Sequence, residues 1–421
     1  MIIRSFVSLP GPRLLATIAG LWVIGLTISS AAAAALPDST WVALPSVPNQ
    51  PKAALFALAV DPSNDQIVIA GDAQGSLVRS TSGGSAWTTA FAGKSAILTI
   101  SFSPNTPRLV FAGTRGGGGL VSRDDGATWA AARGLEGRSV RVFAFALTFM
   151  AAGTDRGVYT SPTGSAWAPS GLSGVSIGAL AVEAIHDPVR LVAGSDVQPP
   201  SGGLALYQSL DGAMTWQAFR PPISGTITVR LAVGPLPPTG NVRPLLAGTN
   251  SGLFTSRDNG ATFSPLSGGG LLPTTDYTQA AFITTHFDRF YVASDGGGSG
   301  AGGLWRTNNA GQTFTSLRPP ELSITALAVS NEEKPVLYMA TFRPSTHVVT
   351  IWTYRDTGGT PHGPAATPSV SASGVRETPP AQVSLVEDLI RSGQLPYIAL
   401  GLGALAVILT AVAAHLRGRY R

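Results

Sequence analysis

The chain contains no cysteine among its 421 residues. This absence excludes disulfide bridges, thiolate zinc sites, lipoprotein attachment and a cysteine nucleophile. No Asn-x-Ser/Thr sequon occurs either, so nothing indicates a glycosylated ectodomain. Charged residues make up only 12% of the chain, and long helix-forming runs are missing.

Glycine and proline are abundant instead, at 50 and 32 residues. This composition predicts many short strands joined by turns. Lys and Arg outnumber Asp and Glu by 28 to 23, but part of the excess lies at the two ends of the chain, at Arg4, Arg13, Arg417, Arg419 and Arg421. Because the middle of the chain is then nearly neutral, we expect no nucleic-acid partner.

Both ends of the chain are hydrophobic. Residues 1–35 carry two Arg, then an apolar run, then small residues, an order typical of a signal peptide; an uncleaved N-terminal anchor is the alternative. At the other end, 395–416 predicts a transmembrane helix, because its apolar run would span a ~30 Å hydrocarbon core at ~1.5 Å per residue. The Arg-rich residues 417–421 would then be a cytoplasmic tail.

The segment 356–392 is rich in Pro, Ser, Thr and Ala, and most of it lacks large apolar side chains. Such a segment buries too little surface to offset its chain entropy, so we predict a disordered stalk. We therefore expect a single-pass protein of the bacterial cell membrane, anchored by its C-terminal helix, with its main domain outside the cytoplasm.

One octet recurs through the middle of the chain. SRDDGATW at 122–129 reappears as SRDNGATF at 256–263. Each octet follows an apolar segment, a second strand-like segment that ends in Ala-Gly or a variant, a loop and a third short strand. Successive octets lie roughly 40–50 residues apart, which is the period of a four-stranded propeller blade. Weaker copies are STSGGSAW (80–87), TSPTGSAW (160–167), SLDGAMTW (209–216) and TNNAGQTF (307–314).

We therefore predict an all-β fold, a seven-bladed β-propeller of four-stranded blades over 36–355, because seven apolar first strands are visible. Six or eight blades are the alternatives. The last blade has no clear fourth strand after it, whereas STWVAL (39–44) resembles the strands that follow the octets. Pairing of 39–44 with the last blade would close the ring and remove an open sheet edge.

The octet pattern Ser-x-Asp-x-Gly-x-Thr-Trp resembles the Asp-box, or BNR repeat, of sialidase-like propellers. Families that share this box include sialidases, xyloglucanase-type glycoside hydrolases, sortilin receptors and the photosystem II assembly-factor family. In such a turn the Asp carboxylate can accept N–H groups, and Gly can take a positive φ. We therefore expect structural roles for Ser122, Asp124, Gly126, Thr128, Trp129, Asp211, Trp216, Ser256, Asp258, Gly260, Thr262 and Phe263.

No catalytic residue is predicted. A glycosidase needs two carboxylates that flank the scissile bond. The sialidase resemblance implies an Arg triad, a Tyr nucleophile paired with Glu, an Asp acid and an Arg-Ile-Pro motif near the first blade, but the region before Trp87 has no such motif. The innermost strands are almost wholly apolar, with Arg141, Arg230 and Gln279 as exceptions. An exo-glycosidase with a divergent active site is the alternative function.

Cofactor signals are equally sparse. The histidines are scattered without ligand spacing, and the glycine runs at 116–119 and 296–303 lack the Gly-Lys-Ser/Thr ending of a P-loop. We predict no cofactor and no histidine metal site, and a loop calcium site stays open.

The loops after the second strands should emerge on one face of the propeller. In a chain with so few charges, a ring of polar residues around that mouth is a candidate recognition surface, although loops are also polar simply because they lie in water. The candidate ligand-binding residues are Asp72, Arg115, Asp155, Arg156, Asp196, Asn250, Asp295 and Arg343.

The favoured function is a non-catalytic, membrane-tethered module that binds or assembles a protein or glycan ligand on this face. The sequence does not separate these two ligand classes. A role as an assembly factor for membrane complexes, which the photosystem resemblance implies, is a further hypothesis.

Overall fold

The structure, a computed structural model, describes residues 36–48, 54–183, 189–221, 223–272, 274–296, 302–343 and 345–358. The predicted signal peptide, transmembrane helix, basic tail and almost all of the predicted stalk lie outside these residues. Among the described residues, no helix is long and apolar enough to cross a bilayer.

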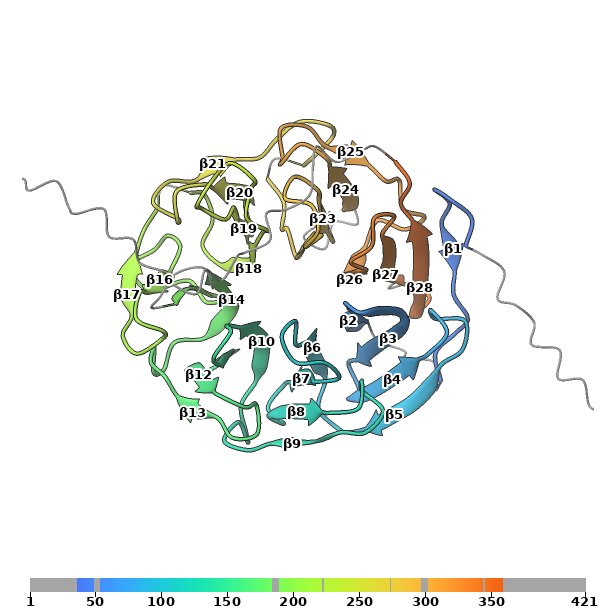
Figure 1. The fold of residues 1–421 in the computed structure, drawn as a ribbon, viewed down its shortest axis with the longest axis horizontal. Helices are drawn as coiled ribbons and strands as arrows, with labels where there is room; N and C mark the ends of the chain where they lie inside the picture. Colours follow the sequence, from blue (N-terminus) through green and yellow to red (C-terminus); the bar gives the residue numbers. More distant parts are fainter. Residues whose placement is uncertain are drawn as a thin grey trace, which may run out of the picture. The chain divides into compact units, whose positions relative to one another are not determined.

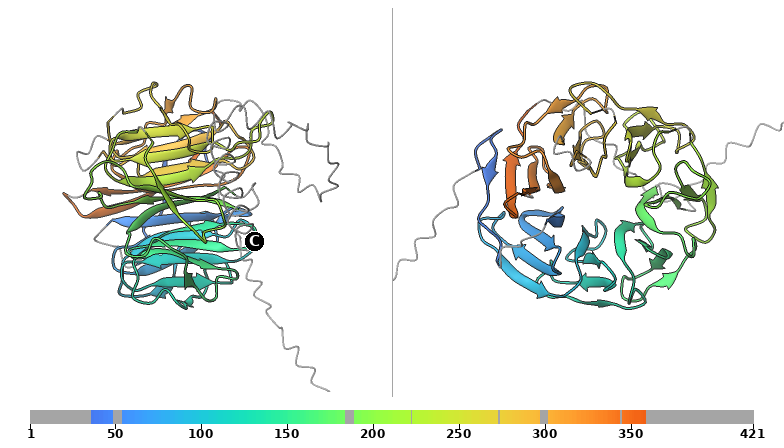
Figure 2. Two further views of the ribbon diagram at one scale, coloured as in Figure 1. Left: turned by 90° about the vertical axis from the view of Figure 1, so that its left-hand side faces the viewer. Right: turned by 180° about the vertical axis from the view of Figure 1, so that it is seen from behind.

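Seven antiparallel sheets of four strands each are arranged around a central channel (Figure 1, Figure 2). The strands of blades 1 to 3 are β2 (Leu55–Asp61), β3 (Asn64–Asp72), β4 (Ser76–Ser80) and β5 (Thr88–Ala92); β6 (Ile97–Phe102), β7 (Val110–Thr114), β8 (Gly119–Ser122) and β9 (Ala130–Ala132); and β10 (Val140–Phe145), β11 (Met150–Thr154), β12 (Gly157–Ser161) and β13 (Ala168–Pro169).

The remaining blades repeat this order from the channel outward. Their strands are β14 (Ile177–Glu183), β15 (Arg190–Ser195), β16 (Leu206–Ser209) and β17 (Gln217–Phe219) in blade 4; β18 (Thr228–Val233), β19 (Leu245–Thr249), β20 (Gly252–Ser256) and β21 (Ser264–Pro265) in blade 5; β22 (Gln279–Phe282), β23 (Phe290–Ser294), β24 (Gly303–Thr307) and β25 (Thr315–Ser316) in blade 6; and β26 (Ile324–Val329), β27 (Val336–Arg343), β28 (Val348–Arg355) and β1 (Val42–Ala43) in blade 7.

Blade 7 is completed by the N-terminal strand, as the sequence predicts. Val42 pairs with Thr353 and Ala43 with Trp352. Trp41 reinforces the closure, because its Nε1 donates to the carbonyl of Leu317 at 2.9 Å. This pairing confirms the seven-bladed count and excludes the alternatives of six or eight blades.

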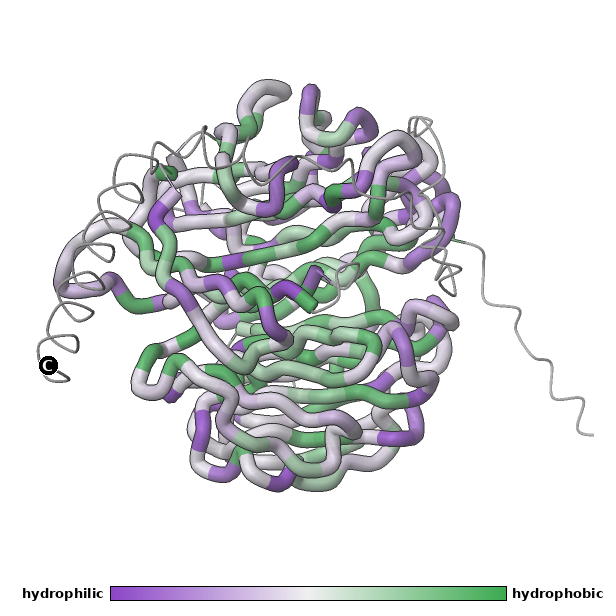
Figure 3. Tube along the Cα trace, turned by 60° about the vertical axis from the view of Figure 1, so that its left-hand side comes forward, coloured by the Kyte–Doolittle hydropathy of each residue, from purple (hydrophilic) through white to green (hydrophobic). Residues whose placement is uncertain are grey.

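The second strand of each blade is packed between the two neighbouring blades. β7, β11, β19 and β23 are buried along their whole length, which explains why these segments are mostly apolar. Figure 3 shows hydrophobic stretches along strands of the domain. The recurring Ala-Gly ending has a steric cause. A Cβ on Gly113 would lie 2.3 Å from the carbonyl oxygen of Val140, and one on Gly248 would lie 2.4 Å from that of Tyr277. Glycine therefore lets adjacent blades approach closely.

The two faces of the ring carry different connections. The start of each first strand pairs with the end of the second, as Ile97 does with Thr114. The loops between second and third strands therefore lie on the same face as the starts of the first strands, and we call this the loop face. The octet turns join third to fourth strands on the opposite face, which we call the turn face.

Candidate ligand-binding channel

The octets on the turn face satisfy their own hydrogen bonds. In blade 2 the carboxylate of Asp124 accepts the backbone N–H of Thr128 at 2.9 Å, its hydroxyl at 2.6 Å and the hydroxyl of Ser122 at 2.7 Å. Asp211 and Asp258 accept the corresponding bonds in blades 4 and 5. Hydrogen bonding by the hydroxyl and backbone of the following threonine lowers the pKa of Asp211 to about 2.

The glycine and the aromatic residue of the octet contact the neighbouring blade. Gly126 has a φ of +78°, and a Cβ there would lie 2.3 Å from Cδ1 of Ile69 in blade 1. Trp216 Nε1 donates at 2.8 Å to the carbonyl of Ser170, which ends blade 3. The octet therefore fixes both its own turn and the seam between blades.

Two of the weaker octets, in blades 6 and 1, keep this shape without a carboxylate. In blade 6, Asn309 Oδ1 accepts the backbone N–H of Thr313 at 2.9 Å. In blade 1, Ser82 Oγ accepts the backbone N–H of Ala86 at 3.1 Å. In these two blades an amide and a hydroxyl take over the hydrogen-bond acceptance of the carboxylate in the same turn.

Three polar residues predicted on the loop face are bonded locally. Asp72 Oδ1 accepts backbone N–H groups two and four residues further on, at 3.0 and 2.8 Å. Asp155 Oδ1 accepts one backbone N–H at 2.9 Å, and Asn250 Oδ1 another at 2.9 Å, in both cases from the segment just before the first strand of the same blade. These three side chains hold their loops in place.

Three more lie away from the channel cavity. Arg343 forms an ion pair with Glu321, and Arg156 is exposed. Asp295 lies near Asp276, whose pKa is raised by burial and then by the negative charge of Asp295. The eight predicted residues therefore do not form one continuous site.

Two of the predicted residues do contact the channel lining. The guanidinium of Arg115 lies over the ring of Phe56, 6.0 Å from its centroid. Asp196 forms an ion pair with Arg141, in which Oδ2 and Nε are 2.7 Å apart. Phe56 and Arg141 both line the central cavity.

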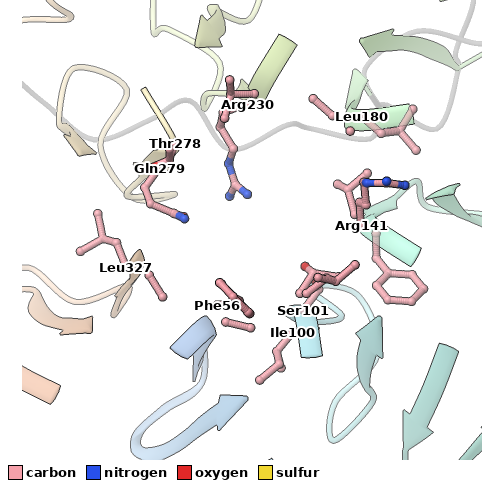
Figure 4. Close-up of a pocket in the computed structure, with 18 of the residues that line it drawn as sticks. Phe56, Ile100, Ser101, Arg141, Leu180, Arg230, Thr278, Gln279 and Leu327 are labelled. Carbon is pink, nitrogen blue, oxygen red and sulfur yellow. The ribbon is translucent and has the colours of Figure 1, made fainter. Parts of the chain in front are cut away.

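This cavity has a volume of about 250 Å³ and is enclosed by the first strands (Figure 4). Most of the lining residues have apolar side chains, such as Leu98, Leu180 and Leu327, but the surface that they leave open to the cavity is mainly polar. Arg230 extends into it from blade 5, and Gln279 from blade 6 reaches toward the same open space. Sites for drug-sized ligands are typically ~300–1,000 Å³, so this cavity fits one side chain or one terminal residue of a larger ligand.

A repeated irregularity directs extra side chains to the cavity. In six blades the register between first and second strands slips by one residue near the start of the first strand, as between Val140 and Val142. The additional residue is Arg141 in blade 3 and Phe56 in blade 1, and a β-bulge re-aims such a side chain. Sequence reasoning singled out Arg141, Arg230 and Gln279 from their polarity, but strict alternation could not find Phe56 or Thr278.

Among the residues that line the cavity, Arg230 is a cation for which the described part of the chain supplies no acceptor. Its Nε is buried and has no hydrogen-bond partner among the described residues, and its guanidinium forms none of their ion pairs. Burial lowers the pKa of Arg230, which means that the site penalises the uncompensated positive charge. The hydroxyl of Thr278, also in the lining, is likewise buried without a partner.

The cavity holds few groups for other chemistry. Its lining residues within the described part of the chain include no Asp, Glu or His. Across the described ranges, no cluster of three or more His, Cys, Asp or Glu side chains could hold a metal ion. The arrangement supplies cationic and amide donors in a cavity whose open surface is mainly polar.

No family model and no curated protein matches the sequence. Solved structures do match the fold. YCF48 bound to D1 peptide has a TM-score of 0.52 at 14% identity, over 75% of this chain and 97% of that one. A chain of the mitotic checkpoint complex has a TM-score of 0.53 at 11% identity, over 82% and 99% of the two chains.

A glycoside hydrolase is also similar. The GH74 xyloglucanase from Xanthomonas campestris has a TM-score of 0.47 at 13% identity, over 72% of this chain and 59% of that one. At these identities the comparisons support the propeller fold alone, and the function has to be argued from the site.

Proposed function

We propose that this protein is a non-catalytic binding module that holds a protein ligand on its loop face and takes an anionic group of that ligand into the channel. The observation that carries the proposal is Arg230, a half-buried arginine in the cavity whose Nε is buried and for which the described residues supply no acceptor. A carboxylate would compensate this charge and form charge-assisted hydrogen bonds.

Two further observations support a protein ligand. The cavity fits a single side chain or a chain terminus rather than an oligosaccharide, and its described lining lacks the two carboxylates that glycoside hydrolysis requires. A structural neighbour, YCF48, was solved with a peptide bound. We further propose that 1–35 directs export and that 395–416 tethers the module to the cell membrane, which the sequence alone supports.

The test is a peptide array probed with the full chain, in which each peptide has either a free or an amidated C-terminus and either acidic or neutral side chains. A glycan array and fluorogenic sialosides and β-glycosides are tested with the same protein. We expect binding to carboxylate-bearing peptides and no turnover.

Arg230→Gln should weaken peptide binding by at least about tenfold, since a hydrogen bond between charged partners is worth roughly 1.5–3 kcal/mol. Arg133→Gln is the matched control, because Arg133 is exposed and lies outside the cavity. Glycoside turnover, or equal binding by the two variants, would overturn the proposal.

A further inference from the structure

An ion pair across two blades occupies one wall of the channel. Asp196 lies just after β15 in blade 4, whereas Arg141 is the bulge residue of β10 in blade 3. Asp196 Oδ2 and Arg141 Nε are 2.7 Å apart, and the two side chains are 26% and 30% exposed. The protein therefore already places one carboxylate on one of the two channel arginines.

The backbone of blade 4 is shaped to allow this contact. Gly178 is the bulge residue of β14, and a Cβ there would lie 2.6 Å from Cβ of Asp196. Real Cβ atoms do not approach this closely, so the carboxylate reaches Arg141 only because position 178 has no side chain. The bulge residues of neighbouring blades, Arg141 and Gly178, thus serve the same ion pair.

The pair is only partly satisfied. Arg141 NH1 and Asp196 Oδ1 are both buried and have no hydrogen-bond partner among the described residues. A guanidinium can donate to two oxygens of one carboxylate or to two separate acceptors. Arg141 therefore keeps one N–H donor for a second anion. The carboxylate of Asp196 neutralises the charge of this guanidinium, which would be fully positive without Asp196.

We infer that Asp196 is a specificity residue that sets the charge of the group the channel accepts. The charged side chains that line the cavity are Arg141 and Arg230, and Asp196 pairs with the first of them, so these three groups carry one net positive charge. Arg115 lies outside the lining, over the ring of Phe56. Such a site selects a monoanion, such as a single carboxylate, over a dianion. The inference rests on the proposed function, because it requires that Arg230 binds the ligand.

The test measures the binding of two small probes to the full chain labelled at arginine ¹⁵Nε. N-acetyl-leucine carries one carboxylate and N-acetyl-glutamate carries two. Signals of Arg141 and Arg230 are assigned from the Arg→Lys variants, and the shifts on titration give both the dissociation constant and the arginine involved. The quantity compared is the ratio of the two dissociation constants.

In the wild-type protein we expect both probes to shift the Arg230 signal, with N-acetyl-leucine bound more tightly than N-acetyl-glutamate. Asp196→Asn keeps the shape of the side chain but leaves the channel with two net positive charges. It should tighten the dicarboxylate roughly tenfold to a hundredfold relative to the monocarboxylate, with a new shift at Arg141, because a charge-assisted bond is gained. Glu321→Gln is the control, since it frees another loop-face arginine, Arg343, outside the cavity.

The double variant Arg141→Gln/Asp196→Asn restores one net positive charge and should restore the wild-type ratio. An unchanged ratio in Asp196→Asn, with the wild-type Arg230 shift present, would overturn this inference and leave the proposed function standing. A purely structural ion pair would lower the melting temperature of Asp196→Asn without moving the ratio. Absence of any Arg230 shift in the wild type would overturn both proposals.

Discussion

Replacement of Asp124 by Ala should destabilise the propeller without affecting its channel. The substitution removes the acceptor of three hydrogen bonds, from Thr128 N, Thr128 Oγ1 and Ser122 Oγ. Each bond contributes about 0.5–1.5 kcal/mol net, and water can replace part of them in this half-exposed turn. We therefore expect a loss of about 1–3 kcal/mol in the free energy of unfolding.

The assay is thermal and urea unfolding of the full chain, compared with Asp125→Asn. Asp125 lies in the same turn, but its ion pair involves Arg108, which is 63% exposed, and an exposed pair contributes roughly 0–1 kcal/mol. A loss of 1–3 kcal/mol corresponds to a fall in melting temperature of about 2–6 °C for a domain of this size.

A double-mutant cycle with Thr128→Val sharpens the test, because the two residues share a hydrogen bond and their effects should not add. The reasoning is refuted if Asp124→Ala costs no more than Asp125→Asn, or if Asp124→Ala and Thr128→Val are additive. Loss of ligand binding at an unchanged melting temperature would assign Asp124 a role in the function instead.

The remaining predictions concern pH and ring closure. Partial burial acts to raise the pKa of Asp124, but bonds from Thr128 and Ser122 outweigh it and hold the pKa at about 2. The contribution of Asp124 to stability is therefore complete above the unfolded pKa of ~3.9 and is lost as the pH falls toward 2. The urea midpoint should fall more steeply between pH 5 and 2 in the wild type than in Asp124→Ala. Parallel pH dependences of the two midpoints would contradict this prediction. Trp41→Ala removes a partly buried hydrogen bond and a ring contact with Tyr354 at 4.8 Å. Because Trp41 is only half-buried, the substitution should cost about 2–3 kcal/mol, less than the ~3–5 kcal/mol of a core Trp→Ala change, read by unfolding against the exposed-site control Thr40→Ala; equal costs would show that the closure does not limit stability.

The fold could be predicted because its signals are local and repeated. Each octet encodes a turn by its own hydrogen bonds, and the middle of each second strand is apolar because blades cover it on both sides. The pairing of 39–44 with the last blade followed from the need to satisfy a sheet edge. The membrane segments were also predicted, and they lie outside the described residues.

The site was harder to predict because it depends on contacts between blades. Polarity alone identified Arg141, Arg230 and Gln279 on the inner strands. The sequence around Asp196 does not indicate that its carboxylate pairs with Arg141 of the neighbouring blade. That ion pair depends on a β-bulge and on the absence of a side chain at Gly178. Register shifts arise from strand pairing, and strict alternation along a strand does not reveal them.

The closure of blade 7 by β1 also dictates an order of events during synthesis. Ser39 and Thr357 are hydrogen-bonded although 318 positions separate them. The strand that completes the ring is therefore made first, and its partner β28 is made last. Every earlier blade must form while the ring is open, and a growing chain has to keep the short apolar segment around Trp41 unpaired until the whole domain has emerged. A chain that stops before β28 has no strand to which β1 can pair, so complete synthesis is a condition for a sealed domain.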